Sequence, residues 1–584
     1  MKNKTDITIK IGGEAGQGLQ TIGQVLSKVF ARQGYFVFSN QVVQSRVRGG
    51  HNWFQVRVCD KPVLAPSSGT DILIALDTES ACHLRELSKN SIVIFDSTVT
   101  ALSVKRGLAL DMPLAKIASD NGGNRIMVNT VATAAVLGLL ECDIQILFDL
   151  INESFAGKDK QVADTNIQIA KAGYAEVFKK IPGNKLPSLA ENIGPVRMLI
   201  AGSEAVALGA LAAGCQFISA YPMSPSTGIM TYLASKEDEY HVLVEQSEDE
   251  IASINIALGA SFAGARAMTA SSGGGFALMA EGLSLAAMTE TPIVVVVAQR
   301  PAPATGLPTR TAQEDLDFVI HAGHGEFTRF VVAPRTIEES FYETARAFNI
   351  AEKYRIPVII LIDQFLADSS SAISGIIASK VKIERFILGD DELKNTKDHK
   401  SYLLTKTGIS PRALPGNPYC FVTADSDEHD ETGRITEDLD LMRPQMVEKR
   451  NKKNELLLKE IKPPVWYGPK DAKNLLIGWG STYGALAEAV DILNESKERA
   501  ALVHFSDVWP LNEKHFDFLK KAKFVAVVEN NFSGQFAGLI ARVTGKILKD
   551  RINKYNGLAF EAEEIASEYK RLISITKRKS AKRG

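Results

Sequence analysis

Short apolar runs alternate with longer stretches of mixed polar and apolar residues along most of the chain. Runs such as ITIKI (7–11), PIVVVVA (292–298) and PVIILID (357–363) are continuous rather than alternating, which is typical of strands buried on both faces of a parallel sheet. The stretches between them are long enough for helices. This alternation predicts a multi-domain α/β protein built on doubly wound sheets.

The same pattern divides the chain into three α/β units and one polar segment. We expect domains at 1–185, 196–380 and 470–575, with a Pro-, Gly- and Lys-containing linker at 181–195. Residues 385–465 are a charged insertion that ends in an amphipathic helix. The middle unit contains seven predicted strands: MLIAG (198–202), FISA (217–220), HVLVEQ (241–246), RAMTA (266–270), PIVVVVA (292–298), RFVVAP (329–334) and PVIILID (357–363).

Composition is that of an ordinary globular protein. The chain has 584 residues, 45% of them hydrophobic and 23% charged, and its net charge of −1 does not favour nucleic acid as a partner. No apolar run reaches the roughly 18 residues of a membrane span, and no signal peptide precedes the first strand. We therefore expect a cytoplasmic protein. None of the five cysteines forms a C-x-x-C pair, so we expect reduced core thiols and no metal on this chain: Cys59, Cys82, Cys142, Cys215 and Cys420.

Candidate chemistry begins where two predicted strands end. The turn YPMSPST (221–227) follows strand 217–220, and two prolines restrict the backbone around the hydroxyl of Ser224. Glu248 lies at a helix start after strand 241–246. Ser247 and Glu250 have the spacing of a capping box, which leaves Glu248 as the acid without an assigned role. The same helix should bury Ile251, Ile254, Leu258 and Phe262.

Two further features follow neighbouring strands. Gly273, Gly274 and Gly275 come after strand 266–270, where they allow a backbone or a flat ligand to approach. Arg300 ends strand 292–298, and Arg310 lies in the Pro- and Gly-rich loop after it. Arginine suits a substrate carboxylate. Each feature also has a plainer explanation, because Glu248 could complement the helix dipole and the arginines could pair with Glu314 or Asp315.

These features converge on one edge of one sheet, the usual position of a ligand crevice in open parallel sheets. A separate glycine-rich turn, GGEAGQG (12–18), follows strand 7–11. It could bind a phosphate at a helix start or simply pack a strand closely against a helix.

Several long motifs together resemble the α subunit of 2-oxoacid:ferredoxin oxidoreductases that carry a fused amino-terminal γ domain. The resemblance covers nearly the whole chain. It rests on YPMSPST (221–227), QSEDEIASINIALGASFAGARAMTASSGGG (246–275), VVVVAQRPAPATGLPTRT (294–311), HAGHGEF (321–327), DSDEHDETG (425–433), MVEKR (446–450), WGSTYGALAEAV (479–490), VVENNFSGQ (527–535), GGEAGQG (12–18) and SRVRGGHN (45–52).

The resemblance implies thiamine diphosphate chemistry, with the 196–380 unit binding the pyrimidine end of the cofactor. Glu248 would hydrogen-bond the aminopyrimidine ring, Ser224 would face the substrate where the family usually has threonine, and Arg300 would pair with the substrate carboxylate. The remaining implied contacts are Tyr221, Pro222, Gly273 and Gly274 for the cofactor, and Arg310 and Thr227 for the substrate or coenzyme A.

The family also implies partners. A β subunit would hold the diphosphate, Mg²⁺ and a [4Fe-4S] cluster, so this chain would be active only within a heterotetramer (αβ)2 that reduces ferredoxin. The expected reaction is oxidative decarboxylation of a 2-oxoacid to acyl-coenzyme A, and 2-oxoglutarate is the first choice of substrate. The 470–575 unit resembles the transketolase carboxyl-terminal domain. Alternatives are pyruvate or a branched-chain substrate, a ferredoxin-independent thiamine enzyme, or a non-catalytic assembly subunit.

Overall fold

The computed structural model describes residues 5–45, 49–157, 159–181, 186–190 and 192–581. It separates into two compact units, one formed by Met1–Ala201 with Asp368–Ile376 and the other by Gly202–Ala367 with Ile377–Gly584. Parts of two predicted features lie outside the described residues: 46–48 of the 45–52 motif, and 182–185 and 191 of the linker. In the described residues no helix is long and apolar enough to cross a membrane.

The first unit is built on an eight-stranded mixed sheet in the order β6-β5-β4-β1-β3-β2-β14-β7. β1, β4, β5 and β6 are parallel, whereas β3, β2, β14 and β7 join through antiparallel pairs. The strands are β1 (Asp6–Ala15), β2 (Phe36–Val42), β3 (Gly49–Cys59), β4 (Thr70–Ala75), β5 (Leu87–Phe95), β6 (Leu108–Asp111), β7 (Met198–Ala201) and β14 (Ser370–Ile373).

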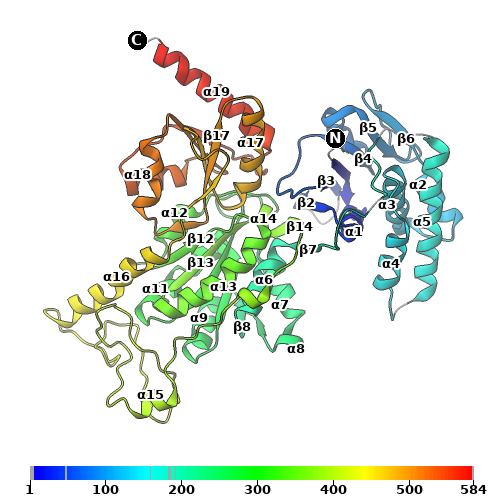
Figure 1. Cartoon of the computed structure of the whole chain (residues 1–584). Coiled ribbons are helices and arrows are strands. Elements are labelled where there is room, and N and C mark those ends of the chain that lie inside the picture. The colour runs from blue at the N-terminus through cyan, green and yellow to red at the C-terminus, as the bar shows by residue number, and fades with distance from the viewer. Residues whose placement is uncertain (1–4, 46–48, 158, 182–185, 191, 582–584) are drawn as a thin grey trace. The chain divides into compact units, whose positions relative to one another are not determined.

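Strand β7 was expected in the middle unit but pairs in this sheet, and the partner that draws it there, β14, lies about 170 residues further along the chain. The helices of the unit pack against the sheet and share its apolar core (Figure 1). They are α1 (Leu19–Arg32), α2 (Leu114–Asp120), α3 (Val128–Leu139), α4 (Gln145–Ser154) and α5 (Lys160–Lys180), with 3-10 segments η1 (Thr78–Glu86) and η2 (Arg125–Met127).

The predicted glycine turn at 12–18 is shorter than expected. β1 continues through Gly12 and Gly13, which pair with Trp53 and Asn52 of β3. Only the end of the motif turns, and Gly18 precedes α1 with a φ of 77°. Since a positive φ favours glycine, the turn itself requires this residue at Gly18 and at Gly16, whose φ is 92°.

The second unit begins with a seven-stranded sheet in the order β18-β12-β13-β11-β10-β8-β9. All of its pairs are parallel except β12 with β18, a strand contributed by the carboxyl-terminal region. The strands are β8 (Phe217–Ala220), β9 (Leu243–Gln246), β10 (Ala267–Ser272), β11 (Ile293–Gln299), β12 (Phe330–Val332), β13 (Pro357–Asp363) and β18 (Asp507–Trp509).

Helices flank this sheet (Figure 1). They are α6 (Gly202–Ala212), α7 (Thr227–Ala234), α8 (Glu237–Tyr240), α9 (Glu250–Phe262), α10 (Gly273–Leu278), α11 (Ala280–Met288), α12 (Leu316–His321), α13 (Ile337–Tyr354) and α14 (Gln364–Asp368). The five valines and isoleucines of β11 are fully buried, as the continuous apolar run predicted.

A second, five-stranded sheet follows in the order β15-β17-β16-β19-β20. Its core joins that of the seven-stranded sheet, because Trp479, Phe505 and Phe536 pack in one cluster with Val295 and Val331. The elements are β15 (Val465–Tyr467), β16 (Asn474–Trp479), β17 (Ala500–Phe505), β19 (Phe524–Glu529), β20 (Asp550–Asn553), α17 (Tyr483–Glu495), α18 (Gln535–Thr544) and α19 (Ala562–Ala581).

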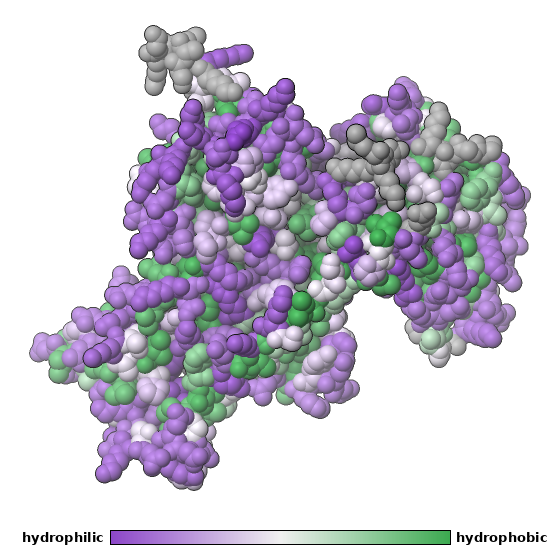
Figure 2. Space-filling view, in the orientation of Figure 1, coloured by the Kyte–Doolittle hydropathy of each residue, from purple (hydrophilic) through white to green (hydrophobic). Residues whose placement is uncertain are grey.

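The charged insertion contains α15 (Asp390–Lys394) and α16 (Met442–Glu460). Its outer surface mixes hydrophilic and hydrophobic residues (Figure 2), and the buried side of α16 is not simply apolar. Lys449 and Lys453 are fully buried there and both bind the carboxylate of Glu290, Lys453 Nζ at 2.6 Å from Oε2. A buried ion triad therefore fixes α16 to the end of α11.

Candidate active site at the edge of the seven-stranded sheet

Four predicted features share one edge of the seven-stranded sheet. Strands β11, β10, β8 and β9 are neighbours in that order and run parallel. The residues that follow their carboxyl ends therefore lie on the same side, where open parallel sheets bind ligands.

Arg300 and Ser224 are in direct contact across this edge. The buried Arg300 follows β11, and its Nη1 donates to the backbone carbonyl of Ser224 at 2.7 Å. Burial lowers the pKa of Arg300, but an arginine remains charged. The Ser224 residue is exposed, so the arginine fixes the turn while the hydroxyl side stays accessible.

The start of α9 differs from the predicted capping box. Asp249, not Ser247, is the N-cap: its carboxylate accepts from the Ala252 N–H at 2.7 Å. Ser247 instead shares a side-chain hydrogen bond with Ser253. Of the four residues expected on the buried face, Ile254 and Leu258 are buried and Phe262 is half-buried, whereas Ile251, in the first turn, is exposed.

The surroundings of Glu248 and Glu250 differ from those that the capping box predicted. Glu250 is only 3% exposed, and its Oε1 accepts from the Ser271 hydroxyl at 3.1 Å. Its Oε2 has no hydrogen-bond partner in the described part of the chain. Glu248 is exposed and makes no hydrogen bond or ion pair with any described residue. The structure therefore directs Glu250, rather than Glu248, toward the end of β10.

The three glycines after β10 have different neighbours. A Cβ on Gly275 would lie 2.3 Å from Glu250 Oε1, and one on Gly273 would lie 2.1 Å from Asp315 Oδ2. Gly274 is exposed, and its nearest neighbour, the Ala304 carbonyl, would be 3.7 Å from a Cβ. Two glycines thus make room for carboxylates of the chain itself, and only Gly274 offers open backbone to a ligand.

Asp315 is an acid of this edge that the sequence analysis considered only as an ion-pair partner. Its backbone N–H donates to Gln299 Oε1 at 3.0 Å. Burial, with the nearby charge of Glu314, raises its pKa to about 6 although Arg300 opposes the shift. The sequence carries no signal for this, since the acid follows a polar loop rather than a strand.

Arg310 and Thr227 lie in the adjoining loop and helix. Arg310 is partly buried, which lowers its pKa, and its side chain has no hydrogen-bond or ion-pair partner in the described residues. Its Cβ packs against Gly557, where an added methyl would meet it at 3.1 Å. Thr227 is the first residue of α7 and is half-buried.

Large apolar side chains are exposed on the elements that carry this edge. Five of them are 40% to 52% exposed, on the turn after β8, on the edge strand β9 and on helices α9 and α10. We call this set the apolar rim: Tyr221, Leu243, Ile251, Ile256 and Leu278. An exposed apolar patch beside polar groups is typical of a surface that binds another molecule.

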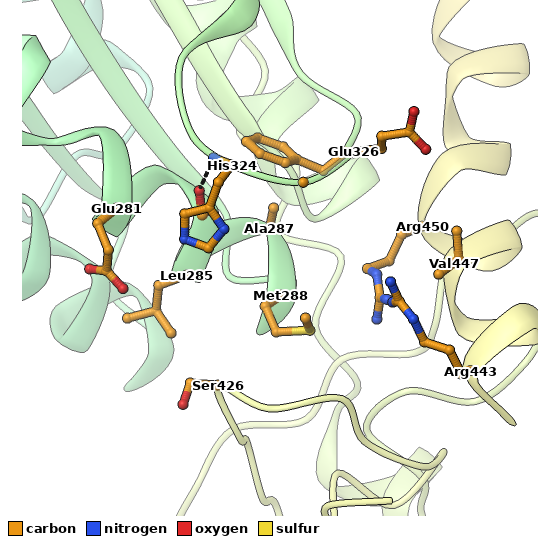
Figure 3. A pocket seen from close by; sticks show the side chains of 13 residues that line it. Glu281, Leu285, Ala287, Met288, His324, Glu326, Ser426, Arg443, Val447 and Arg450 are labelled. Carbon is orange, nitrogen blue, oxygen red and sulfur yellow. Dashed lines mark hydrogen bonds between the residues drawn. The ribbon is translucent and has the colours of Figure 1, made fainter. Parts of the chain in front are cut away.

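The 321–327 and 425–450 motifs meet elsewhere, around a cavity of about 390 Å³ (Figure 3). Glu281 and His324 lie on one side of it, and Arg443 and Arg450 on the other. Both guanidiniums bind Glu428, and Arg450 does so bidentately at 2.8 Å for each bond. These ion pairs therefore join α16 to the 425–433 motif within the charged insertion.

Comparison with known proteins places this architecture. Residues 208–448 match the family described as pyruvate flavodoxin/ferredoxin oxidoreductase, thiamine diphosphate-binding, and residues 8–176 match pyruvate ferredoxin/flavodoxin oxidoreductase. The 2-oxoacid:ferredoxin oxidoreductase subunit alpha of a Sulfolobus species is 33% identical over 95% of both chains. The 2-oxoglutarate oxidoreductase subunit KorA of Mycobacterium tuberculosis is 28% identical over 96% of this chain and 90% of its own.

A solved structure agrees over its whole length. It is 2-oxoglutarate:ferredoxin oxidoreductase from Magnetococcus marinus with 2-oxoglutarate, coenzyme A and succinyl-CoA bound. Its TM-score is 0.91 and its identity 30%, over 97% of this chain and 100% of that chain. Fold and site together define a multi-domain α/β oxidoreductase subunit with a thiamine diphosphate-binding domain. The chain belongs to the 2-oxoacid:ferredoxin oxidoreductase family, as an alpha subunit. The resemblance and the fold class inferred from the sequence are confirmed.

Proposed function

We propose that this chain is the α component of a 2-oxoglutarate:ferredoxin oxidoreductase and that the edge of its seven-stranded sheet holds the pyrimidine end of thiamine diphosphate. The observation that carries this proposal is the arrangement of Glu250, Gly274 and Arg300 at adjacent strand ends, inside the apolar rim. Relatives named for 2-oxoglutarate, and the ligands named with the Magnetococcus structure, support the choice of substrate.

The residues present fit the cofactor. Gly274 leaves backbone open to a flat ring, and Glu250 keeps one carboxylate oxygen available beside it. Thiamine diphosphate, when bound, supplies the electron sink for decarboxylation. We assign to Glu250 the hydrogen bond to the aminopyrimidine ring that the resemblance gave to Glu248, because a buried carboxylate can orient a ring better than a freely rotating exposed one. Tyr221, Pro222 and Gly273 would border the ring.

The substrate would lie between Ser224 and the two arginines. Arg300 would pair with the carboxylate next to the 2-oxo group, and the Ser224 hydroxyl would donate a hydrogen bond to the substrate. The Arg310 side chain has no partner among the residues that the structure describes, so it can take either the second carboxylate of 2-oxoglutarate or a phosphate of coenzyme A. Thr227 lies near the start of the same crevice.

The site needs a second chain. We propose that a β subunit covers the apolar rim and brings the diphosphate pocket, Mg²⁺ and a [4Fe-4S] cluster, within a heterotetramer that passes electrons to ferredoxin. The division into a γ-type domain (1–185), a pyrimidine-binding domain (196–380), a charged insertion (385–465) and a transketolase-like carboxyl-terminal domain (470–575) belongs to the same proposal.

Co-expression with a cluster-bearing β subunit tests the function. The purified complex should reduce a viologen dye with 2-oxoglutarate only when coenzyme A is present, and the α chain alone should not. Equal or better rates with pyruvate or a branched-chain 2-oxoacid would overturn the substrate assignment. Turnover that needs no cluster-bearing partner would favour a ferredoxin-independent thiamine enzyme, and a complex whose activity survives loss of both Glu250 and Arg300 would make this chain an assembly subunit.

The two arginines can be separated with a pair of substrates. Arg300→Ala should raise KM about 10- to 100-fold for both 2-oxoglutarate and pyruvate, because a charge-assisted pair is worth about 1.5–3 kcal/mol. Arg310→Ala should raise KM for 2-oxoglutarate alone or for coenzyme A alone, which identifies its ligand. An unchanged KM for every substrate in either variant would remove that arginine from the site.

A further inference from the structure

The first unit contains a cluster of donor atoms that the oxidoreductase chemistry does not use. His51 lies on β3, and Cys82 and His83 lie on η1. One nitrogen from each histidine and the sulfur of Cys82 lie within 4.8 Å of one another. The two imidazoles face each other through their Nε2 atoms, which are 2.9 Å apart.

The opposite nitrogen of each ring is held by a carboxylate. His51 Nδ1 lies 3.0 Å from Asp77 Oδ2, and His83 Nδ1 lies 2.9 Å from Glu86 Oε1. The other carboxylate oxygens are also occupied: Asp77 Oδ1 accepts from the N–H and hydroxyl of Ser80, and Glu86 Oε2 accepts from Lys10 and Thr70.

Each carboxylate already accepts from two donors at its other oxygen, Asp77 from Ser80 and Glu86 from Lys10 and Thr70. A carboxylate held in this way is an acceptor, so each histidine Nδ1 beside it carries the proton of the shared hydrogen bond. The two Nε2 atoms then direct lone pairs at each other across 2.9 Å, an arrangement that requires a cation between them.

We propose that this cluster is a divalent metal site of the zinc type, in which His51 Nε2, His83 Nε2 and Cys82 Sγ are ligands. Two nitrogens and one sulfur suit Zn²⁺, and a carboxylate behind each ligating histidine is the usual outer support of such sites. Zn–N bonds of about 2.0–2.1 Å in a tetrahedron need nitrogens about 3.3 Å apart, so the imidazoles must separate by only about 0.4 Å.

Charge balance agrees with this assignment. Asp77 and Glu86 contribute two negative charges and Lys10 one positive charge, which leaves one negative charge within the cluster. A divalent cation with a Cys82 thiolate neutralises it. A single shared proton would also do so, but it would involve the two imidazoles alone and make no use of the sulfur. Cys82 is exposed, so the metal can enter from that side and a water can occupy the fourth position.

The backbone beneath this cluster leaves no room for a side chain. Gly12 of β1 lies beneath it, and a Cβ there would be 2.5 Å from Ser80 Oγ and 3.0 Å from His51 Cε1. The first glycine of the 12–18 motif and the histidine of the 45–52 motif therefore belong to one local structure. The close packing at this cluster thus explains why both motifs contain these residues.

Metal titration of the full-length chain tests the proposal without any substrate or partner. Chain stripped with a chelator should bind one equivalent of Co²⁺, with the near-ultraviolet absorption of a sulfur-to-cobalt bond, and one equivalent of Zn²⁺ should displace it. Cys82→Ser should abolish the sulfur band, and His83→Gln should weaken binding at least 10-fold. Cys420→Ser, which removes a cysteine outside the cluster, is the matched control and should bind like the natural chain.

The stability and the fold of each variant are measured alongside metal binding. Zn²⁺ should raise the melting temperature of the natural chain and of Cys420→Ser but not of Cys82→Ser, with far-ultraviolet circular dichroism confirming that each variant is folded. The proposal fails if the stripped chain takes up no metal at micromolar concentration, because the imidazoles then share a proton. It fails equally if Cys82→Ser retains both the sulfur band and the full affinity.

Discussion

The edge of the seven-stranded sheet and the histidine cluster of the first unit are both built from buried carboxylates, but they differ in how completely this chain satisfies them. In the histidine cluster every oxygen of Asp77 and Glu86 receives a donor. At the sheet edge, Glu250 Oε2 and the Arg310 guanidinium have no partner among the described residues, and the apolar rim is exposed. The carboxylates of the histidine cluster are thus finished by their own chain, with only the ligand atoms of His51, Cys82 and His83 left for a metal, whereas the sheet edge leaves a carboxylate and a guanidinium for other molecules.

This difference implies different costs of mutation. A group that already has all its partners contributes to stability, and removing one leaves the others unsatisfied. A group without a partner contributes little to stability, and it contributes to binding only when a ligand is present. Substitutions at the sheet edge should therefore reduce turnover while the chain stays folded. Substitutions in the histidine cluster should instead lower the melting temperature and leave turnover less affected.

The largest effect is expected for Glu250→Gln. Loss of a positioned acid–base group typically costs 10²- to 10⁴-fold, so viologen reduction by the reconstituted complex should fall at least 100-fold. The melting temperature of the α chain should change little, since Gln can still accept from the Ser271 hydroxyl at the same position.

Glu248→Gln is the matched control, two residues away on the same turn. It should retain activity within about twofold, because Glu248 is exposed and contacts none of the described residues. A 100-fold loss in Glu248→Gln with normal turnover in Glu250→Gln would reverse the assignment, return the role to the residue first inferred from the sequence, and show that the β subunit draws the exposed acid into the site.

An intermediate effect is expected in the finished region. Gly12→Ala places a methyl against Ser80 and His51, and overpacking of this kind costs about 1–3 kcal/mol. The first unit should unfold at a lower temperature and bind metal more weakly. Gly69→Ala is the control, because only Ser67 Oγ, at 3.9 Å, would lie near its new methyl. Equal melting temperatures for the two variants would show that the cluster tolerates displacement and is not a finished site.

Much of the fold follows from the sequence because buried parallel strands carry long apolar runs. FISA (217–220) and PVIILID (357–363) coincide with β8 and β13. The antiparallel strands β2, β3, β14 and β18 were missed, because the first two are mixed in polarity and the last two are short and pair with segments far away in the chain. Local pattern cannot reveal which distant segment completes a sheet.

The site was predictable as a region but not in every residue. Strand order alone brings Arg300 to Ser224, so that part needed only the α/β pattern. The capping box predicted for Ser247 and Glu250 does not form, because Asp249 is the N-cap, whereas the role that the resemblance gave to Glu248 stays a prediction. Cys82 was expected in the core and is exposed, whereas Cys59, Cys142 and Cys215 are buried. Its neighbour His51 is 31 positions away, and no sequence spacing rule joins them.

The smallest effect on stability is expected at Asp315, which lies at the edge of the seven-stranded sheet, where burial disfavours its charged form. Because burial raises its pKa to about 6 from 3.8, the folded chain binds more protons than the unfolded chain between about pH 4 and 6, and the free energy of unfolding must fall as pH rises through that window.

Asp315→Asn removes the ionisation. A shift of about two pKa units corresponds to at most about 3 kcal/mol, a value that already includes the opposing attraction to Arg300. The variant should therefore match the natural chain in melting temperature near pH 4 and exceed it at pH 7.5, whereas Asp238→Asn, at an exposed acid, should show no such difference. A variant that is less stable at pH 7.5 would mean that Asp315 and Arg300 stabilise each other as an ion pair, and the sheet edge would then be as complete within this chain as the histidine cluster is.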